Sequence, residues 1–319
     1  MEFKVNKEEI TCAEVIFDDI QEQSVELDYV LPDYFPEIFK ILKCITTPRI
    51  MSYNVNGDKL TYEMAVCIRI LYCSENSKAV QAVDQKLTYT KNVDLSRTGI
   101  NPKVCIVPKI DYMNCRAVNQ RRLDVRGAVS VRVKVSDLNK REVVNDAFGG
   151  NIQLKKIPVT YPSNKLYTTK RINLTEEFDL GLSKPPIVNI LRSDAVIASN
   201  DKKNIANKLI AKGEVYINML YSCLKDGADS IESMQFTLPF SQIVDMEGID
   251  ERYNCSVDTE ILSCDIEPRS DGDGNSKIAE CNLVVLISCS AHRISTADLA
   301  VDEYSTEYRT NSVKSDVKI

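Results

Sequence analysis

The stretch KLTYEMAVCIRILYC, from Lys59 to Cys73, alternates between two kinds of side chain. Because successive side chains of a β-strand point to opposite faces, this period of two predicts a long strand with one buried face. The side chains expected on the buried face are Tyr62, Met64, Val66, Ile68, Ile70 and Tyr72.

A second stretch, RRLDVRGAVSVRVKV from Arg121 to Val135, shows the same alternation, with valines on one face and charged residues on the other. Asn56-Gly57 lies just before the first stretch and is a strong signal for a hairpin turn. Long antiparallel strands with one dry face must pack that face against another sheet. The sequence therefore predicts a mainly β protein built from antiparallel β-sandwiches or barrel-like domains.

Two proline-containing segments interrupt this pattern: LPDYFPEIFKIL, from Leu31 to Leu42, and LSKPPIVNIL, from Leu182 to Leu191. Proline suits the first turn of a helix, and the apolar residues that follow have a spacing of three and four. We therefore expect one short Pro-led helix in each domain, packed over an open end or edge of the sandwich.

The chain also contains an internal duplication. Ile41-Leu42 and Ile190-Leu191 are 149 residues apart, and the same offset relates Leu71-Tyr72 to Leu220-Tyr221 and Cys115 to Cys264. An offset of this length is too long for a solenoid repeat, so we predict two tandem copies of one domain, residues 1–160 and 161–319.

Composition restricts the possible functions. The 319 residues carry a net charge of −6 with acidic and basic residues interspersed, so nucleic-acid binding is not expected. The N-terminal MEFKVNKEEI has no apolar signal region, and no apolar run is long enough to span a membrane. We therefore expect a cytoplasmic protein that does not insert into membranes.

No residue pattern indicates an enzyme, a metal site or a cofactor. The 11 cysteines include no C-x-x-C pair, and His292 is the single histidine, so a zinc site is not predicted. Small buried thiols are the main interpretation, and cross-linking by an oxidant is the alternative. The DGDGNS loop from Asp271 to Ser276 departs from a calcium-binding loop at its sixth and twelfth positions, which favours a solvated hairpin loop.

Two surfaces are candidates for contacts with other proteins. Arg126, Arg132 and Lys134 form a basic row that could bind an acidic partner, although such a row is also typical of the wet face of a strand. The stretch LVVLIS, from Leu283 to Ser288, is apolar on both faces, so Val284 and Leu286 need a cover. An offset of 154 aligns these two residues with Ser130 and Arg132, and the cover could be domain 1, the C-terminal tail or another subunit.

The run LPDYFPEIFKILKC, from Leu31 to Cys44, followed by a strand that ends ILYC, resembles the SPOCS domain of spore-coat morphogenetic proteins. The second copy carries the strand motif as KGEVYINMLY, from Lys212 to Tyr221, but has Ser183-Lys184-Pro185-Pro186-Ile187 in place of the first motif. The resemblance extends over nearly the whole chain, twice.

This resemblance implies a non-enzymatic structural role. Proteins of this family are made in the mother-cell cytoplasm and build the coat at the forespore surface by binding other spore-coat morphogenetic proteins. Many carry a peptidoglycan-binding LysM module, which is not recognisable before the final RTNSVKSDVKI. We also expect a homo-oligomer or filament. The alternatives are a glycan-binding β-domain, which would need exposed tyrosines because the chain has no Trp, and a hydrolase with scattered carboxylates.

Overall fold

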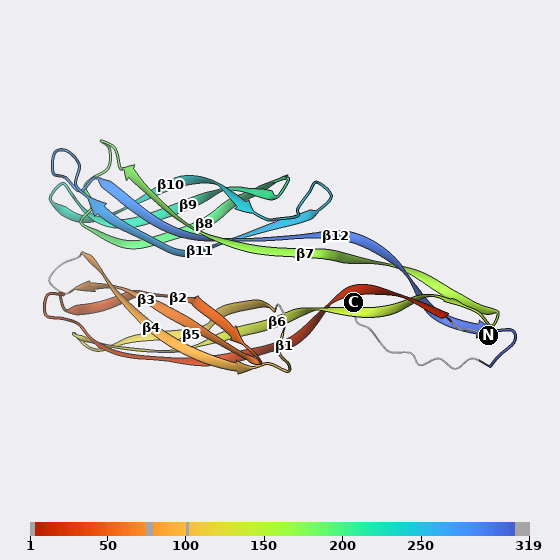
Figure 1. The fold of residues 1–319 in the computed structure, drawn as a ribbon. Coiled ribbons are helices and arrows are strands. Elements are labelled where there is room, and N and C mark those ends of the chain that lie inside the picture. Colours follow the sequence, from red (N-terminus) through yellow and green to blue (C-terminus); the bar gives the residue numbers. More distant parts are fainter. Residues whose placement is uncertain (1–3, 75–78, 100–101, 310–319) are drawn as a thin grey trace.

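The computed structural model of the chain describes residues 4–74, 79–99 and 102–309, and within these residues it contains twelve β-strands and no helix. The protein is therefore mainly β, as predicted. Figure 1 shows two elongated sandwiches lying one above the other and joined at one end by long strands.

The first sandwich, domain 1, consists of two antiparallel three-stranded sheets with the orders β1-β6-β5 and β2-β3-β4. Its strands are β1 (Lys4–Val30), β2 (Ile38–Asn56), β3 (Lys59–Ser74), β4 (Val80–Asp94), β5 (Lys103–Asn119) and β6 (Arg122–Phe148).

Domain 2 repeats this arrangement with sheets β11-β12-β7 and β10-β9-β8. Its strands are β7 (Ile152–Asp179), β8 (Asn189–Ile205), β9 (Lys208–Lys225), β10 (Ala228–Asp245), β11 (Asn254–Arg269) and β12 (Ile278–Ser305). The two halves of the chain therefore share one topology. The predicted boundary between residues 160 and 161 stays a prediction; β7 begins at Ile152.

The alternation seen in the sequence matches the burial of the central strands β3, β6, β9 and β12. Val66 of β3 and Val215 of β9, which are 149 residues apart, are both fully buried. Each of these central strands sends its inner row into the core between the two sheets of its own domain. The hydrophobic effect acting on these four rows is the main driving force for the two sandwiches.

The two predicted Pro-led helices are wrong. Residues 31–37 form turns, and Ile38 begins strand β2. β-Bulges place Phe39 and Leu42 as extra residues in this strand. A bulge adds one residue to a period of two, so two bulges generate a spacing of three between inward side chains. The spacing that we interpreted as helical therefore comes from a bulged strand, in which Ile38, Ile41 and Cys44 pack on the core.

The proline turn closes one end of each sandwich by connecting its two sheets. In domain 1 the amide of Leu31 donates to the carbonyl of Arg121 (2.7 Å), and that of Ile38 donates to Gln120 (2.7 Å). Domain 2 has the matching bonds, Leu180 to Lys277 (2.9 Å) and Ile187 to Ser276 (2.8 Å).

A buried tyrosine of the core forms a hydrogen bond to each proline turn. The Tyr72 hydroxyl donates to the Pro36 carbonyl (2.9 Å), and the Tyr221 hydroxyl donates to the Pro185 carbonyl (3.3 Å). Burial raises the pKa of both phenols to about 12, so both act as neutral donors. The proline turn therefore does not need helical hydrogen bonds, because a core tyrosine donates to its proline carbonyl.

Strand pairing also shows how the two copies align. The offset is 149 through the paired strands β2–β3 and β8–β9. It becomes 151 after the next hairpin, because Val80 lies opposite Cys73 and Ile231 opposite Ser222. In the long strands β6 and β12 it is 156, because the carbonyls of Arg121 and Lys277 accept the matching turn bonds from Leu31 and Leu180. The alignment of Val284 with Ser130 at an offset of 154 is therefore wrong by two residues; Val284 matches Ala128, and Leu286 matches Ser130.

Both long strand pairs continue beyond their sandwiches and meet in a two-layered stalk, made of residues 4–15, 136–148, 152–163 and 293–305. Figure 1 shows these strands crossing at one end of the molecule. The stalk has its own small apolar core, which contains Ile10 and Cys12 from β1, Tyr161 from β7 and Ala297 from β12. The two domains are therefore tied together by secondary structure and not by a loose linker.

Replacing Tyr72 by Phe should lower the free energy of unfolding by about 1 kcal/mol, because the Pro36 carbonyl loses its buried donor. Tyr62→Phe is the matched control on the same strand, since its hydroxyl meets the side chain of Gln21 (3.0 Å), which can bind water instead. Urea denaturation measures both variants. Equal stability of Tyr72→Phe and the wild type would show that the hydroxyl does not hold the turn.

Candidate functional site

The contact between the two sandwiches is the most extensive candidate site, and it joins unlike surfaces. Domain 1 contributes the outer face of sheet β2-β3-β4, and domain 2 contributes the side on which β8 and β11 lie next to each other. At its centre Leu191 of β8 packs with Leu71 of β3 and Val80 of β4, and all three are buried. Arg49 adds a hydrogen bond from its Nη1 to the carbonyl of Leu262 (2.5 Å).

A polar cleft of about 320 Å³ lies beside this apolar contact. Arg69 forms a two-pronged bond to Asp84 (2.6 and 2.7 Å) and also donates to the Leu191 carbonyl (3.5 Å). Arg192 pairs with Asp194 of the same strand, β8 (2.5 Å). Because these arginines already have carboxylate partners from their own domains, the cleft is better suited to orienting the two domains than to binding an anion.

The predicted basic row lies on the outer face of β6, on the side of domain 1 that faces away from domain 2 (Figure 1). Arg132 contacts Asp18 of β1 (3.1 Å), and Arg126 contacts Asp124 (3.1 Å). The hydrogen bond from Arg132 lowers the pKa of Asp18. Lys134 lies opposite Asp18 in the strand register. The row is therefore interleaved with acidic residues of the same sheet, which weakens its attraction for an acidic partner.

Val284 and Leu286 lie on the outer face of β12 and are partly exposed. Strand β11 of this sheet, β11-β12-β7, and strand β8 of the other sheet both reach domain 1. On the same face Tyr167 lies opposite Ser290, and its ring receives the ammonium of Lys103 from domain 1 (5.7 Å). The sheet face that carries Val284 and Leu286 therefore meets domain 1 at Tyr167. The C-terminal tail, from residue 310, lies outside the described residues.

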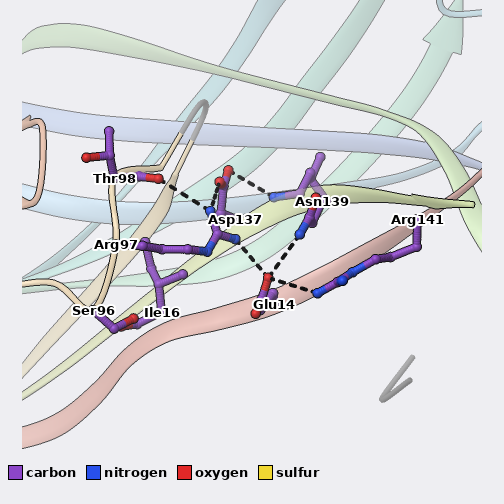
Figure 2. A network of polar contacts seen from close by, with 9 residues as sticks. Glu14, Ile16, Ser96, Arg97, Thr98, Asp137, Asn139 and Arg141 are labelled. Carbon is purple, nitrogen blue, oxygen red and sulfur yellow. Dashed lines mark hydrogen bonds and ion pairs between the residues drawn. The ribbon is translucent and has the colours of Figure 1, made fainter. Parts of the chain in front are cut away.

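A charged cluster fixes the place where β1 and β6 leave domain 1 for the stalk (Figure 2). Arg97, in the loop after β4, binds the buried carboxylate of Asp137 (3.1 Å) and the carboxylate of Glu14 (2.9 Å). Asn139 also donates to Glu14 (3.1 Å), and these hydrogen bonds from Asn139 and Arg97 lower the pKa of Glu14. The cluster ties the loop to both long strands.

Domain 2 has the same clamp with reversed charges. Arg293 of β12 stands 156 residues after Asp137, and it binds Asp250 of the loop after β10 (2.5 Å). Asp250 also accepts from Arg252 (2.8 Å), and the guanidinium of Arg293 lies 4.7 Å from the ring of Tyr253. Sequence reasoning missed both clamps, because the loop residues that form them have no periodic pattern.

Arg97→Met should destabilise the protein by about 1–3 kcal/mol, because Asp137 is 2% exposed and would lose its cationic partner. Arg122→Met is the control, since its ion pair with Asp28 is exposed and should contribute little. Thermal and urea denaturation compare the two variants. Similar losses from both would mean that the buried clamp has no special role.

All 11 cysteines have free thiols, and the described residues contain no group of three or more His, Cys, Asp or Glu that could hold a metal ion. Two thiol pairs are close enough to share a hydrogen bond. Cys44 of β2 meets Cys115 of β5, and Cys264 of β11 meets Cys281 of β12. The shared hydrogen bond lowers the pKa of Cys44 and raises that of Cys115. Cys44 is therefore the thiol of this pair that ionises first.

Cys44 should react with iodoacetamide near neutral pH several-fold faster than Cys115, because the thiolate is the reactive form. Cys115→Ala removes the hydrogen bond and should slow the alkylation of Cys44. Peptide mass spectrometry of a labelling time course measures both rates. An unchanged Cys44 rate in the Cys115→Ala variant would contradict this assignment.

The remaining sequence candidates lie apart from these clusters. His292 is partly exposed at an irregular point of β12. In the DGDGNS loop the carboxylate of Asp271 accepts from the amides of Asp273 (3.0 Å) and Asn275 (2.8 Å), so it already organises the turn.

Comparison with protein families gives two matches to one domain model, that of the SipL SPOCS domain, over residues 37–118 and 186–268. Together the two matches cover just over half of the chain. The chain belongs to the SipL SPOCS-domain family. The first match spans strands β2 to β5 and the second spans β8 to β11, so each SPOCS match covers four strands of one sandwich.

The searches of curated proteins and of solved structures found no match. Within its described residues the chain has no helix with the length and apolar character that crossing a membrane requires. The family match indicates a sporulation-related protein.

Proposed function

We propose that the protein is a non-enzymatic structural component of the bacterial spore surface, made in the mother cell and assembled at the forespore through contacts with other spore-coat morphogenetic proteins and with copies of itself. The observation that carries the proposal is the pair of SPOCS-domain matches, one in each sandwich of the molecule.

The surfaces of the molecule support a role in protein–protein contact. Large apolar side chains are exposed on the strands of both domains, among them Phe39, Tyr112, Val196, Tyr216 and Ile231. Soluble proteins rarely leave contiguous apolar patches uncovered unless these patches bind a partner. Open edge strands in both sheets of each sandwich add sites at which another chain could align.

A glycan-binding role is the alternative. Its support is Tyr34, which is exposed on the proline turn of domain 1 with its ring 4.8 Å from that of Phe35. In domain 2 Ser183 and Lys184 occupy these positions, so an aromatic platform would exist in one copy only. Structural assembly accounts for both copies and is therefore the preferred function.

A fluorescent fusion of the full chain, expressed from its own promoter during sporulation, tests the proposal. The fusion should form a ring or cap around the forespore, and the protein should be recovered in the coat fraction of purified spores. The fluorescent protein alone, expressed from the same promoter, is the control. A fusion that stays diffuse in the mother cell, together with a coat fraction that lacks the protein, would overturn the proposal.

A further inference from the structure

One edge strand of the molecule, β4, lacks the interruptions that protect the others. Each three-stranded sheet leaves one edge of both outer strands without a paired strand among the described residues. Of these outer strands, β2, β5, β7, β10 and β11 contain proline, and β1 and β8 contain β-bulges. β4 has neither between Val80 and Asp94. Because prolines and bulges hinder pairing with another chain, β4 has the most regular open edge that the structure describes.

The second half of β4 lies away from domain 2. Val80 and Ala82, at the start of the strand, belong to the apolar cluster around Leu191 of domain 2. Residues 84–86 line the cleft beside that cluster. Figure 1 shows β4 running from the side of domain 1 near domain 2 towards the opposite side. The segment from Lys86 to Asp94 is therefore the part of this edge that another chain can reach.

The sequence of this segment, KLTYTKNVD, is complementary to itself when two copies run antiparallel. A two-fold axis at Thr90 places Lys86 of each copy opposite Asp94 of the other, which gives two ion pairs. Both side chains are exposed. The same axis places Tyr89 opposite Lys91, where an ammonium and a ring attract each other. Two copies of β4 thus match in charge along the whole segment.

The neighbouring registers are unfavourable. Residues that turn their hydrogen-bonding groups to the open edge must lie opposite one another, so the two-fold axis can move only from one residue to the next. An axis at Tyr89 would place Asp84 opposite Asp94, and an axis at Lys91 would place the two copies of this lysine opposite each other. Like charges directly opposite are destabilising, so the charges select the axis at Thr90.

The charges also favour a second copy over an unrelated strand. Lysines on an edge strand normally discourage pairing with other chains. Within the described residues Lys86 and Asp94 form no ion pair, whereas Asp84 already binds Arg69 (2.6 Å). A strand without the complementary pattern would leave Lys86 and Asp94 without partners, but a second β4 supplies both.

Domain 2 does not obstruct this pairing. Val80, where β4 meets domain 2, lies ten residues from Thr90, which is about 33 Å along an extended strand. Antiparallel pairing sends the second copy of Val80 in the opposite direction from the axis. The two copies of domain 2 therefore lie at opposite ends of the paired segment.

We propose that two copies of this chain pair through β4, antiparallel and with a two-fold axis at Thr90, so that sheet β2-β3-β4 becomes half of a continuous six-stranded sheet. This inference rests on the self-association included in the proposed function, and it adds the surface, the register and the order of the assembly. Because both copies use the same surface, the contact closes on itself and gives a dimer.

Charge reversal tests the two ion pairs. Lys86→Asp and Asp94→Lys each place like charges opposite each other twice, so each should weaken dimerisation by about tenfold or more. The double variant with both substitutions restores opposite charges and should dimerise about as tightly as the wild type. An equimolar mixture of the two single variants should form 1:1 dimers, because every aspartate at these positions then faces a lysine.

A cysteine at the axis tests the register. Residues directly opposite in an antiparallel pair have Cα atoms about 4.5–5.5 Å apart, which a disulfide can span. Oxidised glutathione should therefore join the two thiols of a Thr90→Cys dimer, with release of two molecules of reduced glutathione. Thr88→Cys is the matched control, exposed on the same face. Its two thiols would be about 13 Å apart along the strand, so they should not join.

Sedimentation velocity of the full chain over a concentration series measures dimerisation, and circular dichroism confirms folding. Lys109→Asp is the charge control, since Lys109 is exposed on another edge strand, β5, and should leave dimerisation unchanged. Non-reducing gels and peptide mass spectrometry identify the disulfide, with the wild type as background for the native cysteines.

The inference is overturned if the wild type stays monomeric, which would leave the edge to a strand of a different protein. It is also overturned if the single charge variants dimerise as the wild type does, if the double variant does not recover, or if Thr88→Cys joins as fast as Thr90→Cys.

These outcomes are separable from failure of the proposed function. A monomeric wild type whose fluorescent fusion still surrounds the forespore would leave the coat role intact, acting through other coat proteins, and would reject only the contact between copies. A fusion that fails to reach the forespore would reject the coat role whatever the purified protein does.

Discussion

Burial of one face of each central strand is the constraint on which this structure depends. In a three-stranded sheet only the middle strand has neighbours on both sides, so β3, β6, β9 and β12 carry the inner rows that fill the two cores. A shift of one residue in any of these strands would turn its apolar row to solvent. The hairpin turns, the proline turns and the charged clamps connect these strands to their neighbours and so help to fix the strand register.

The clamps also distinguish two domains that are otherwise copies. Domain 1 places the cation Arg97 on the loop and the anion Asp137 on the long strand, whereas domain 2 places Asp250 on the loop and Arg293 on the strand. If a loop met the strand of the wrong domain during folding, like charges would face each other. Reversed polarity therefore disfavours exchange between neighbouring copies of the same fold, a recurrent hazard of tandem repeats.

The sequence predicted most of the fold, because period-two alternation follows directly from strand geometry. It failed at the proline segments, since Ile38, Ile41 and Leu42 have the spacing of a helical face. The bulged strand instead turns Ile38, Ile41 and Cys44 to the core and leaves Leu42 exposed. The sequence indicated domain 1 as one possible cover for Val284 and Leu286, but it did not predict the contact through Leu191. Leu42 and Leu191 look identical in sequence, and only the packing of one sandwich on the other makes one buried and the other exposed. The clamp residues were missed because a single loop arginine or aspartate carries no periodic signal.

The central claim is that two like domains meet through unlike surfaces, and hydroxyl-radical footprinting of the dilute chain tests it most directly. Side-chain oxidation measured by mass spectrometry should be fast at Leu42 and Ile231 and slow at Leu191 and Val80, in accord with their exposure. Equal oxidation of Leu42 and Leu191 would contradict the account, because it would mean that the two copies present the same surface to solvent.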